Sequence, residues 1–596
     1  MGPEHAQADA PEDVAAPRPT LTRALLLSVP LALAGVWWIH QASLVQAPGQ
    51  IYAPVYLLSV PPVPAVIFLF VLAALSAAVA RRRARGLAPP TTGPVLATGS
   101  PDGSAQGPAG SPHCERGRGW LGPLSSRELM VIYIVLVVAI PPTTFGIIEM
   151  LLPWVTSPSY FGTPQDGLDE VAGRYFPGWM YPHDPEAIRM MFEGSETGAI
   201  PWQPWLAPLA GWLGFIMLLF ATSVCLMTLF HRQWSEHERL RYPLLLLPLS
   251  VADPGGRHAE IRGLFRNPLT WIAIALVAIH HALNVAHAYN PGVLALMDRH
   301  PVGKIFTEKP WTAFRGLTFF HRPQMVGFSY FVSVDVLFSG WFFFVFQMFI
   351  QMMADVLGYR AAAGFPYAPQ QGSGAFVALF FALVWVAKGE LWGMVRVLSL
   401  DSRRSRSEGA APRVGEAGSA PSRACGPSGD RPRPHEPLPP AYALWGALGG
   451  FALLMVWCVA MKMSLGLALA YFGLLLGWAV VYARIRAEAG VASMWAFPFD
   501  QHPQLITAAL GSRGLIQGSD ATQLVMLSIF SWFSRGYFPS MAGCVVESEK
   551  LAQETSLPAR LTPWLLVGAL LIGMLGGYYV TLKSYYDVGA NVLHGG

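Results

Sequence analysis

Apolar residues occur in blocks of about 20 along almost the whole chain, separated by polar segments. A helix of that length crosses a ~30 Å hydrocarbon core, whereas a soluble helix alternates polar and apolar residues every 3.6 positions. Of the 596 residues, 53% are hydrophobic and 13% are charged. Soluble domains carry about 25% charged residues, so too little polar surface remains to cover a water-soluble fold. The sequence therefore predicts an integral membrane protein.

The fold class that we predict is all-α: a polytopic transmembrane helix bundle of 11 to 12 spans, with broken or re-entrant helices and an internal duplication. Eleven spans can be placed directly on the sequence. They are 24–45, 56–80, 128–152, 206–229, 268–289, 334–357, 374–397, 441–461, 465–483, 521–541 and 562–582.

The N-terminal leader, residues 1–23, is polar, and the apolar run after it ends near Val45-Gln46-Ala47, which weakly resembles a signal-peptidase site. A cleaved signal is one interpretation. A signal-anchor helix is favoured, because Trp37 and Trp38 suit an interfacial aromatic belt and the leader is long for a signal peptide.

Three linkers are rich in arginine and should be cytoplasmic by the positive-inside rule: 81–118, 232–266 and 403–433. The same rule places the N-terminus in the cytoplasm. The predicted location is the inner (cytoplasmic) membrane of the cell. The first and third are dense in Pro, Gly, Ser and Ala and are predicted to be disordered. The predicted organisation is a leader 1–23, two spans in 24–80, a linker 81–126, a first bundle 127–399, a linker 400–440 and a second bundle 441–596.

The segment 153–205 is acidic and rich in aromatic residues. Acidic composition indicates the extracytoplasmic side, and the aromatic residues indicate an ordered segment that caps the bundle.

The number of predicted spans conflicts with the positive-inside rule. If 334–357 and 374–397 each cross the membrane once, the third basic linker lies outside the cell and not in the cytoplasm. A continuous helix over 325–357 would be about 50 Å long, too long for the bilayer, so we expect a break and a short helix around 325–332. Prolines at 141–142 and 61–64 lie inside or beside apolar blocks and should open or kink those helices.

Ionisable residues inside spans are costly and are candidates for function. Asp335 with Ser329 and Ser333 is the main candidate for substrate or ion coupling, in the bundle interior beside the predicted break. An interhelical hydrogen-bond cluster is the equally weighted alternative. Glu149 and Arg535 complete the coupling hypothesis, whereas Lys388 and Glu390 are interpreted as a snorkelling pair.

Histidines at 280 and 287, with Asn284, share one stripe of the predicted helix 268–289. They are weak metal candidates, since no carboxylate or cysteine stands at ligand spacing, and polar residues facing the bundle or the interface are preferred. The five cysteines form no zinc or disulfide pattern. No cofactor is expected.

Two predicted spans leave the membrane with related sequences. The fourth continues into RQWSEHERLRYP with Glu238 and Arg239, and the ninth into RIRAEAG with Arg486 and Glu488. Each exit places Arg and Glu on the cytoplasmic rim ahead of an apolar, proline-broken stretch. The pair indicates an internal duplication with re-entrant elements, or else two ordinary positive-inside rims.

The two helix exits also belong to a wider resemblance. The segments QWSEHERLRYPLLLLP at 233–248, 300–337, RIRAEAG at 484–490 and 585–590 resemble an uncharacterised family of multi-pass bacterial membrane proteins. By helix count, duplication and the Asn-Pro-Gly triplet at 290–292, that family is similar in style to the oligopeptide transporter superfamily. The nearer family implies no activity and no functional residues.

No GxxxxGK[ST], HExxH or GxSxG motif is present, which argues against a P-loop motor, a zincin-like protease and a serine hydrolase. No catalytic residue is predicted. The preferred function is a secondary permease that moves an unknown small-molecule substrate with a proton or sodium ion. The alternatives are a membrane-embedded enzyme or assembly factor acting on a lipid-linked substrate, and a structural membrane subunit. The expected partner is the lipid bilayer, and nucleic acid is not expected.

Overall fold

A computed structural model describes residues 19–44, 61–86, 122–143, 147–165, 167–252, 267–296, 299–321, 323–359, 365–407, 437–491, 496–516, 518, 520–535 and 537–593. The predictions for most of the leader, for most of the two disordered linkers and for the start of the second span lie outside these residues. α3 and α13 continue past the predicted ends of their spans, to Gly86 and Ser407.

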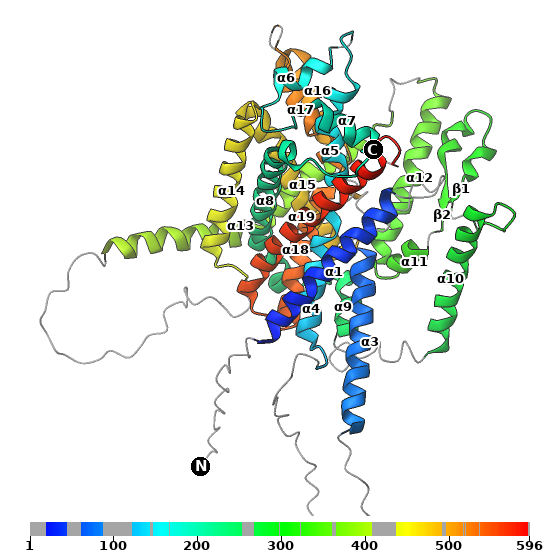
Figure 1. Ribbon diagram of the computed structural model, residues 1–596, viewed down its shortest axis with the longest axis vertical. Helices are drawn as coiled ribbons and strands as arrows, with labels where there is room; N and C mark the ends of the chain where they lie inside the picture. The colour runs from blue at the N-terminus through cyan, green and yellow to red at the C-terminus, as the bar shows by residue number, and fades with distance from the viewer. Residues whose placement is uncertain are drawn as a thin grey trace, which may run out of the picture.

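The described chain is almost entirely helical (Figure 1). Its helices are α1 Pro19–Leu44, α3 Val63–Gly86, α4 Ser126–Ala139, α5 Ile148–Phe161, α6 Asp169–Tyr175, α7 Pro185–Glu193, α8 Trp202–Arg232, α9 Leu246–Ala252, α10 Pro268–Tyr289, α11 Pro323–Ser329, α12 Val334–Val356, α13 Ala368–Ser407, α14 Pro440–Ala460, α15 Leu465–Ala489, α16 Gln501–Leu515, α17 Thr522–Ile529, α18 Tyr537–Glu554 and α19 Thr562–Val588. Two short strands, β1 Arg299–His300 and β2 Phe319–Phe320, pair antiparallel.

Within the described residues, ten helical segments are long and apolar enough to cross a membrane, and they match ten of the eleven predicted spans. The prediction for 521–541 is wrong. Ser528 and Ser531 interrupt that apolar run, the chain turns after Ile529, and a 3₁₀ turn at Trp532–Arg535 leads into α18.

Two predicted helix breaks are confirmed. α4 ends at Ala139, a 3₁₀ turn at Pro141–Thr143 follows, and α5 begins only at Ile148. Likewise α11 and α12 are separate helices, so no continuous helix spans 325–357. The second proline group, 61–64, behaves differently: Pro61 and Pro62 precede α3, and Pro64 lies in its first turn, where proline does not break a helix.

α4 lies at the centre of one half of the bundle. It begins with a capping box between Ser125 and Glu128, and it is apolar on every side, as a helix surrounded by others must be. Every residue from Leu129 to Ala139 is buried, against α1, α3, α9, α18 and α19.

Glycines of α19 let it approach the break after α4. A Cβ atom on Gly573 would lie 2.0 Å from the carbonyl oxygen of Ala139, and one on Gly577 would lie 2.4 Å from Ile148. Small residues four positions apart are a common way for membrane helices to pack closely. α19 therefore holds both sides of the break.

The other half pairs α8 with α14, and α15 with α13 and α18. α18 also packs against α4, α8 and α19, so it lies where the two halves meet. Whether the halves are a duplication stays a prediction.

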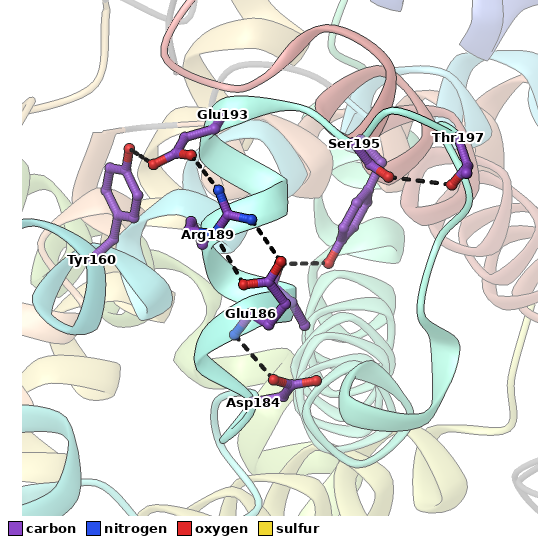
Figure 2. Close-up of polar contacts among 9 residues, drawn as sticks. Tyr160, Asp184, Glu186, Arg189, Glu193, Ser195 and Thr197 are labelled. Atoms are coloured by element: carbon purple, nitrogen blue, oxygen red, sulfur yellow. Dashed lines mark hydrogen bonds and ion pairs between the residues drawn. The ribbon is translucent and has the colours of Figure 1, made fainter.

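The acidic segment 153–205 is ordered, as predicted. α5 extends into it to Phe161, and α6 and α7 follow. Arg189 of α7 binds Glu186 and Glu193, and Tyr160 donates to Glu193 (Figure 2). The hydrogen bonds from Arg189 lower the pKa of the exposed Glu186 carboxyl.

The C-terminal end of the described chain fixes this segment to the bundle. The backbone N–H of Ser195 donates to Tyr586 (2.7 Å), and that of Ala590 donates to Met191 (2.9 Å). The Tyr586 hydroxyl donates to the carbonyl of Ala187 and accepts from the indole of Trp205. The segment therefore caps α19.

α10, α11, α12 and the strand pair form an arm on one side of the bundle (Figure 1). Apolar side chains such as Trp271 and Phe343 are exposed along α10 and α12, as expected of faces that lie against lipid.

Candidate functional site

The two related helix exits meet in space. α8 ends in a π-helical turn at Gln233–His237, and α15 ends at Ala489. The backbone N–H of Tyr242 donates to the carbonyl of Ala487 at 2.9 Å. Arg484 forms a close ion pair with Glu238 and a second, 3.0 Å from Nε to Oε2, with Glu488. The α8 and α15 exits, which are separated by 246 positions in the sequence, are therefore in direct contact.

Arg239 lies in the tight turn between these contacts, with a φ of 52°. Glu238, Arg239 and Glu488 are at least partly exposed, in keeping with the predicted rim. The prediction of a rim position is wrong for Arg486, which is 1% exposed. Residues two apart on a helix do not share a face, so Arg484 reaches the surface while Arg486 points into the bundle.

Arg486 binds a carboxylate of α18 in the interior. Its Nε and Nη2 donate to the two oxygens of Glu547 at 2.6 and 2.7 Å. A two-pronged pair of this kind is strongly orienting. The exposed side-chain fractions are 0% and 9%, so neither charge is accessible to bulk water.

A second acid, Glu549, lies two residues further along α18 and is fully buried. Its Oε1 is 2.5 Å from the hydroxyl of Thr228 on α8. Its Oε2 is 3.3 Å from Nδ1 of His231, one turn along α8. Neither Oε2 of Glu549 nor Nδ1 of His231 makes a hydrogen bond. We call Arg486, Glu547, Glu549, Thr228 and His231 the α18 cluster.

A small cavity adjoins the α18 cluster. It measures about 20 Å³ and is lined by Thr228 and His231, together with Arg232. Apolar residues that line its other side include Met394 of α13 and Leu438 just before α14. A space of that size can hold a water molecule.

Glu149 is 3% exposed and belongs to a second buried site. Its Oε2 accepts from Ser43 at 2.9 Å, and its Oε1 lies 3.5 Å from Nδ1 of His40 on α1. The other ring nitrogen of His40 is 2.9 Å from the hydroxyl of Ser584 on α19, and Thr581 is 3.5 Å from Nδ1. We call this the Glu149 site. It places the predicted carboxylate in the interior.

The prediction of an interior position for Asp335 is wrong. Asp335 lies in the first turn of α12, where its side chain is exposed. The predicted serine cluster does not form either, because Ser329 donates to the carbonyl of Val326 and Ser333 only precedes the helix. α11 and α12 belong to the arm, which leaves this turn uncovered. A coupling role for these three residues stays a prediction.

The remaining candidates lie elsewhere. Arg535 ends the 3₁₀ turn before α18, and its side chain is outside the described residues. Glu390 does not pair with Lys388; it lies 3.3 Å from Arg232 and 3.5 Å from His237 at the α8 exit.

The histidines of the α10 stripe have partners within the arm. His280 contacts Asn284, and His287 contacts the carbonyl of Val293 at 2.6 Å. The part of the chain that the structure describes holds no group of three or more potential metal ligands.

Sequence reasoning missed Glu547, Glu549 and His231. The predicted span 521–541 ended before both acids and so placed them outside the membrane. A usable signal was present: Glu547 and Glu549 directly follow the apolar run 541–546, and the alternation puts two carboxylates on different sides of a single turn.

Residues 116–596 match the model of a family described as a family of unknown function, DUF6785. The chain belongs to this family. This confirms the predicted membership of an uncharacterised family. No curated protein and no solved structure matches the chain.

Proposed function

We propose that the protein is a secondary permease, in which an ion gradient drives a small solute across the membrane and the α18 cluster is the coupling site. The observation that carries the proposal is the burial of two carboxylates on one turn of α18, each facing a base from a different helix. Such groups are costly inside a membrane protein and mark ion pathways when they occur there.

The two pairs differ in what they can do. The Arg486–Glu547 pair holds fixed opposite charges, because arginine does not lose its proton in proteins. The His231–Glu549 pair contains two groups that can each gain or lose a proton. A fixed pair orients helices, and a titratable pair beside a cavity exchanges an ion.

The helix breaks support the same proposal. Opened backbone is tolerated in a membrane only where protein or water surrounds it, and broken helices build the central sites of many secondary transporters. Here the chain breaks after α4 and before α18, and these two helices pack together.

An enzyme or assembly factor acting on a lipid-linked substrate would need its polar groups at a membrane surface. The α18 cluster lies at the ends of α8 and α15 yet is buried, which supports ion exchange inside the protein over chemistry at the membrane surface. We further propose the cytoplasmic membrane as the location, with the N-terminus and the helix exits on the cytoplasmic side, because the arginine-rich linkers flank them.

The experiment is uptake into proteoliposomes across a metabolite library, with a proton gradient, a sodium gradient or none. Wild-type protein should accumulate at least one solute under a gradient, and Glu549→Gln should lose that response. Glu488→Gln is the matched control, since it removes the same charge from a side chain that is 60% exposed. If no solute accumulates under either gradient, or if both variants behave alike, the proposal is wrong.

A further inference from the structure

The hydroxyl of Thr228 has two partners that ordinarily accept. It lies 2.9 Å from the carbonyl oxygen of Val224 and 2.5 Å from Oε1 of Glu549. A hydroxyl has one proton to donate. Each contact is a full two-centre hydrogen bond only if the carboxyl of Glu549 carries a proton and donates it to Thr228, which then donates to Val224. The same assignment makes Oε2 of Glu549 a carbonyl oxygen, which lies 3.3 Å from Nδ1 of His231 without a hydrogen bond between them.

The charges of the α18 cluster also indicate one additional proton on the His231–Glu549 pair. Arg486 and Glu547 cancel, so an ionised Glu549 beside a neutral His231 would leave one uncompensated negative charge in the interior. An unpaired buried charge is strongly unfavourable. One additional proton, shared by His231 and Glu549, makes the cluster neutral, and the Thr228 contacts place it on Glu549.

The geometry points to a proton as the coupling ion: the His231–Glu549 pair holds one exchangeable proton, which rests on Glu549 in this conformation and leaves through His231 and the adjoining cavity. This inference rests on the proposed function and names its ion.

The exchange needs no further reactant. Glu549 passes its proton to Nδ1 of the neutral imidazole, the ring nitrogen that faces it at 3.3 Å, which gives a carboxylate and an imidazolium. The imidazolium then passes the proton on its other nitrogen, Nε2, to a water molecule in the cavity, and the pair is left with a single negative charge. Uptake is the reverse.

The groups that face Glu549 from the packed helices define its electrostatic surroundings. They are Cys225 and His231 of α8 and Tyr242 after the α8 exit. Glu547 lies two residues before Glu549 on α18 and is paired with Arg486 of α15, and Tyr133 of α4 is beside that pair. Of these, Arg486 is a fixed cation, and its charge is already balanced by Glu547.

Sodium fits this site less well. Hard cations take several oxygen ligands, and Glu549 faces one hydroxyl, which is already bonded to Val224, and one imidazole nitrogen. An imidazole suits a proton and not a sodium ion.

The test is infrared spectroscopy of the purified full-length protein in lipid nanodiscs, with pH raised stepwise. We expect a carbonyl band of a protonated carboxylic acid at neutral pH that is absent from Glu549→Gln and lost from wild type at alkaline pH. Glu149→Gln and Glu488→Gln serve as controls and should keep this band.

Thr228→Val and Thr228→Ser give a second, independent readout. Valine removes the hydroxyl that accepts the proton, so the band should shift, whereas serine keeps the hydroxyl and the band. This comparison remains decisive if Glu549→Gln does not fold. A wild-type spectrum in which no protonated carboxyl band depends on residue 549 or residue 228 overturns the inference.

The two proposals fail differently. Solute uptake driven by sodium, together with an ionised Glu549 in the spectra, would overturn the proton and keep the permease. A protonated Glu549 in a protein that transports no solute under any gradient would overturn the permease, and the proton on Glu549 would stand.

Discussion

The bundle contains two buried carboxylate–histidine pairs, and their surroundings differ. At the Glu149 site, hydroxyls of Ser43, Thr581 and Ser584 surround the pair. At the α18 cluster, the pair lies beside a fixed ion pair and a cavity of about 20 Å³. The same two residue types are therefore surrounded by three hydroxyls in one place and lie beside a cavity large enough for a water molecule in the other. We assign structure to the first and ion exchange to the second.

The largest effect is expected from the fixed ion pair that only the α18 cluster has. Arg486→Ala leaves Glu547 as an unpaired buried charge, and breaking such a pair costs about 3–5 kcal/mol. Thermal unfolding in detergent, followed by tryptophan fluorescence, measures it. The double variant Arg486→Met/Glu547→Leu replaces both charges by apolar groups and should recover most of the loss. A double variant as unstable as the single one would show that the charges have a role beyond balancing each other.

A smaller effect is expected at the Glu149 site. Glu149→Gln keeps a hydrogen-bonding group for Ser43 but changes the partner of His40, which should cost about 1–3 kcal/mol of stability. Gradient-driven uptake of the folded protein should be unchanged. If uptake by Glu149→Gln no longer depends on the gradient, ion exchange takes place at Glu149 on α5 and not at the α18 cluster.

Asp335→Asn is expected to change neither stability nor uptake by more than a small amount. Its side chain is exposed in the first turn of α12, and substitutions at such positions are usually within about 0.5 kcal/mol. Uptake assays on Asp335→Asn and Glu549→Gln prepared in parallel separate the two candidates. If only Asp335→Asn loses gradient-driven uptake, Asp335 of the arm is the coupling residue and Glu549 is not.

The smallest effect is a pH dependence of the cap. Arg189 lowers the pKa of Glu186 below its ordinary value of 4.5. A lowered pKa means that this contact stabilises α7 above the ordinary value and is lost as pH falls through the lowered one. Proteolysis of the cap should quicken only under acidic conditions, with a weaker pH dependence in Glu186→Gln. Equal pH profiles for the two proteins would exclude this contact as the cause.

The fold could be predicted largely from the length of its apolar blocks, because the bilayer fixes how long a spanning helix must be. The breaks at Pro141 and between α11 and α12 followed from proline chemistry and from length. The site could be predicted only in part. Glu149 and Arg486 stand out in the sequence, but their partners come from helices far away in the chain: His40 from α1 and Glu547 from α18.

Asp335 shows the opposite limit of sequence reasoning. An acid inside an apolar block indicates an enclosed position only if the helix is surrounded by others. α4 and α12 both belong to segments apolar enough to cross a membrane, yet α4 is buried on all sides and α12 is exposed along its length. Which helices surround which is decided by tertiary packing, and no local pattern reports it.

The most direct test of the account compares net accumulation with solute exchange in Glu549→Gln and Glu149→Gln proteoliposomes, using a solute found in the library screen. Exchange between equal pools needs no net movement of protons, whereas accumulation does. The account predicts that Glu549→Gln keeps exchange and loses accumulation driven by a proton gradient, and that Glu149→Gln keeps both. Accumulation by Glu549→Gln at the wild-type level would contradict the assignment of ion coupling to the α18 cluster.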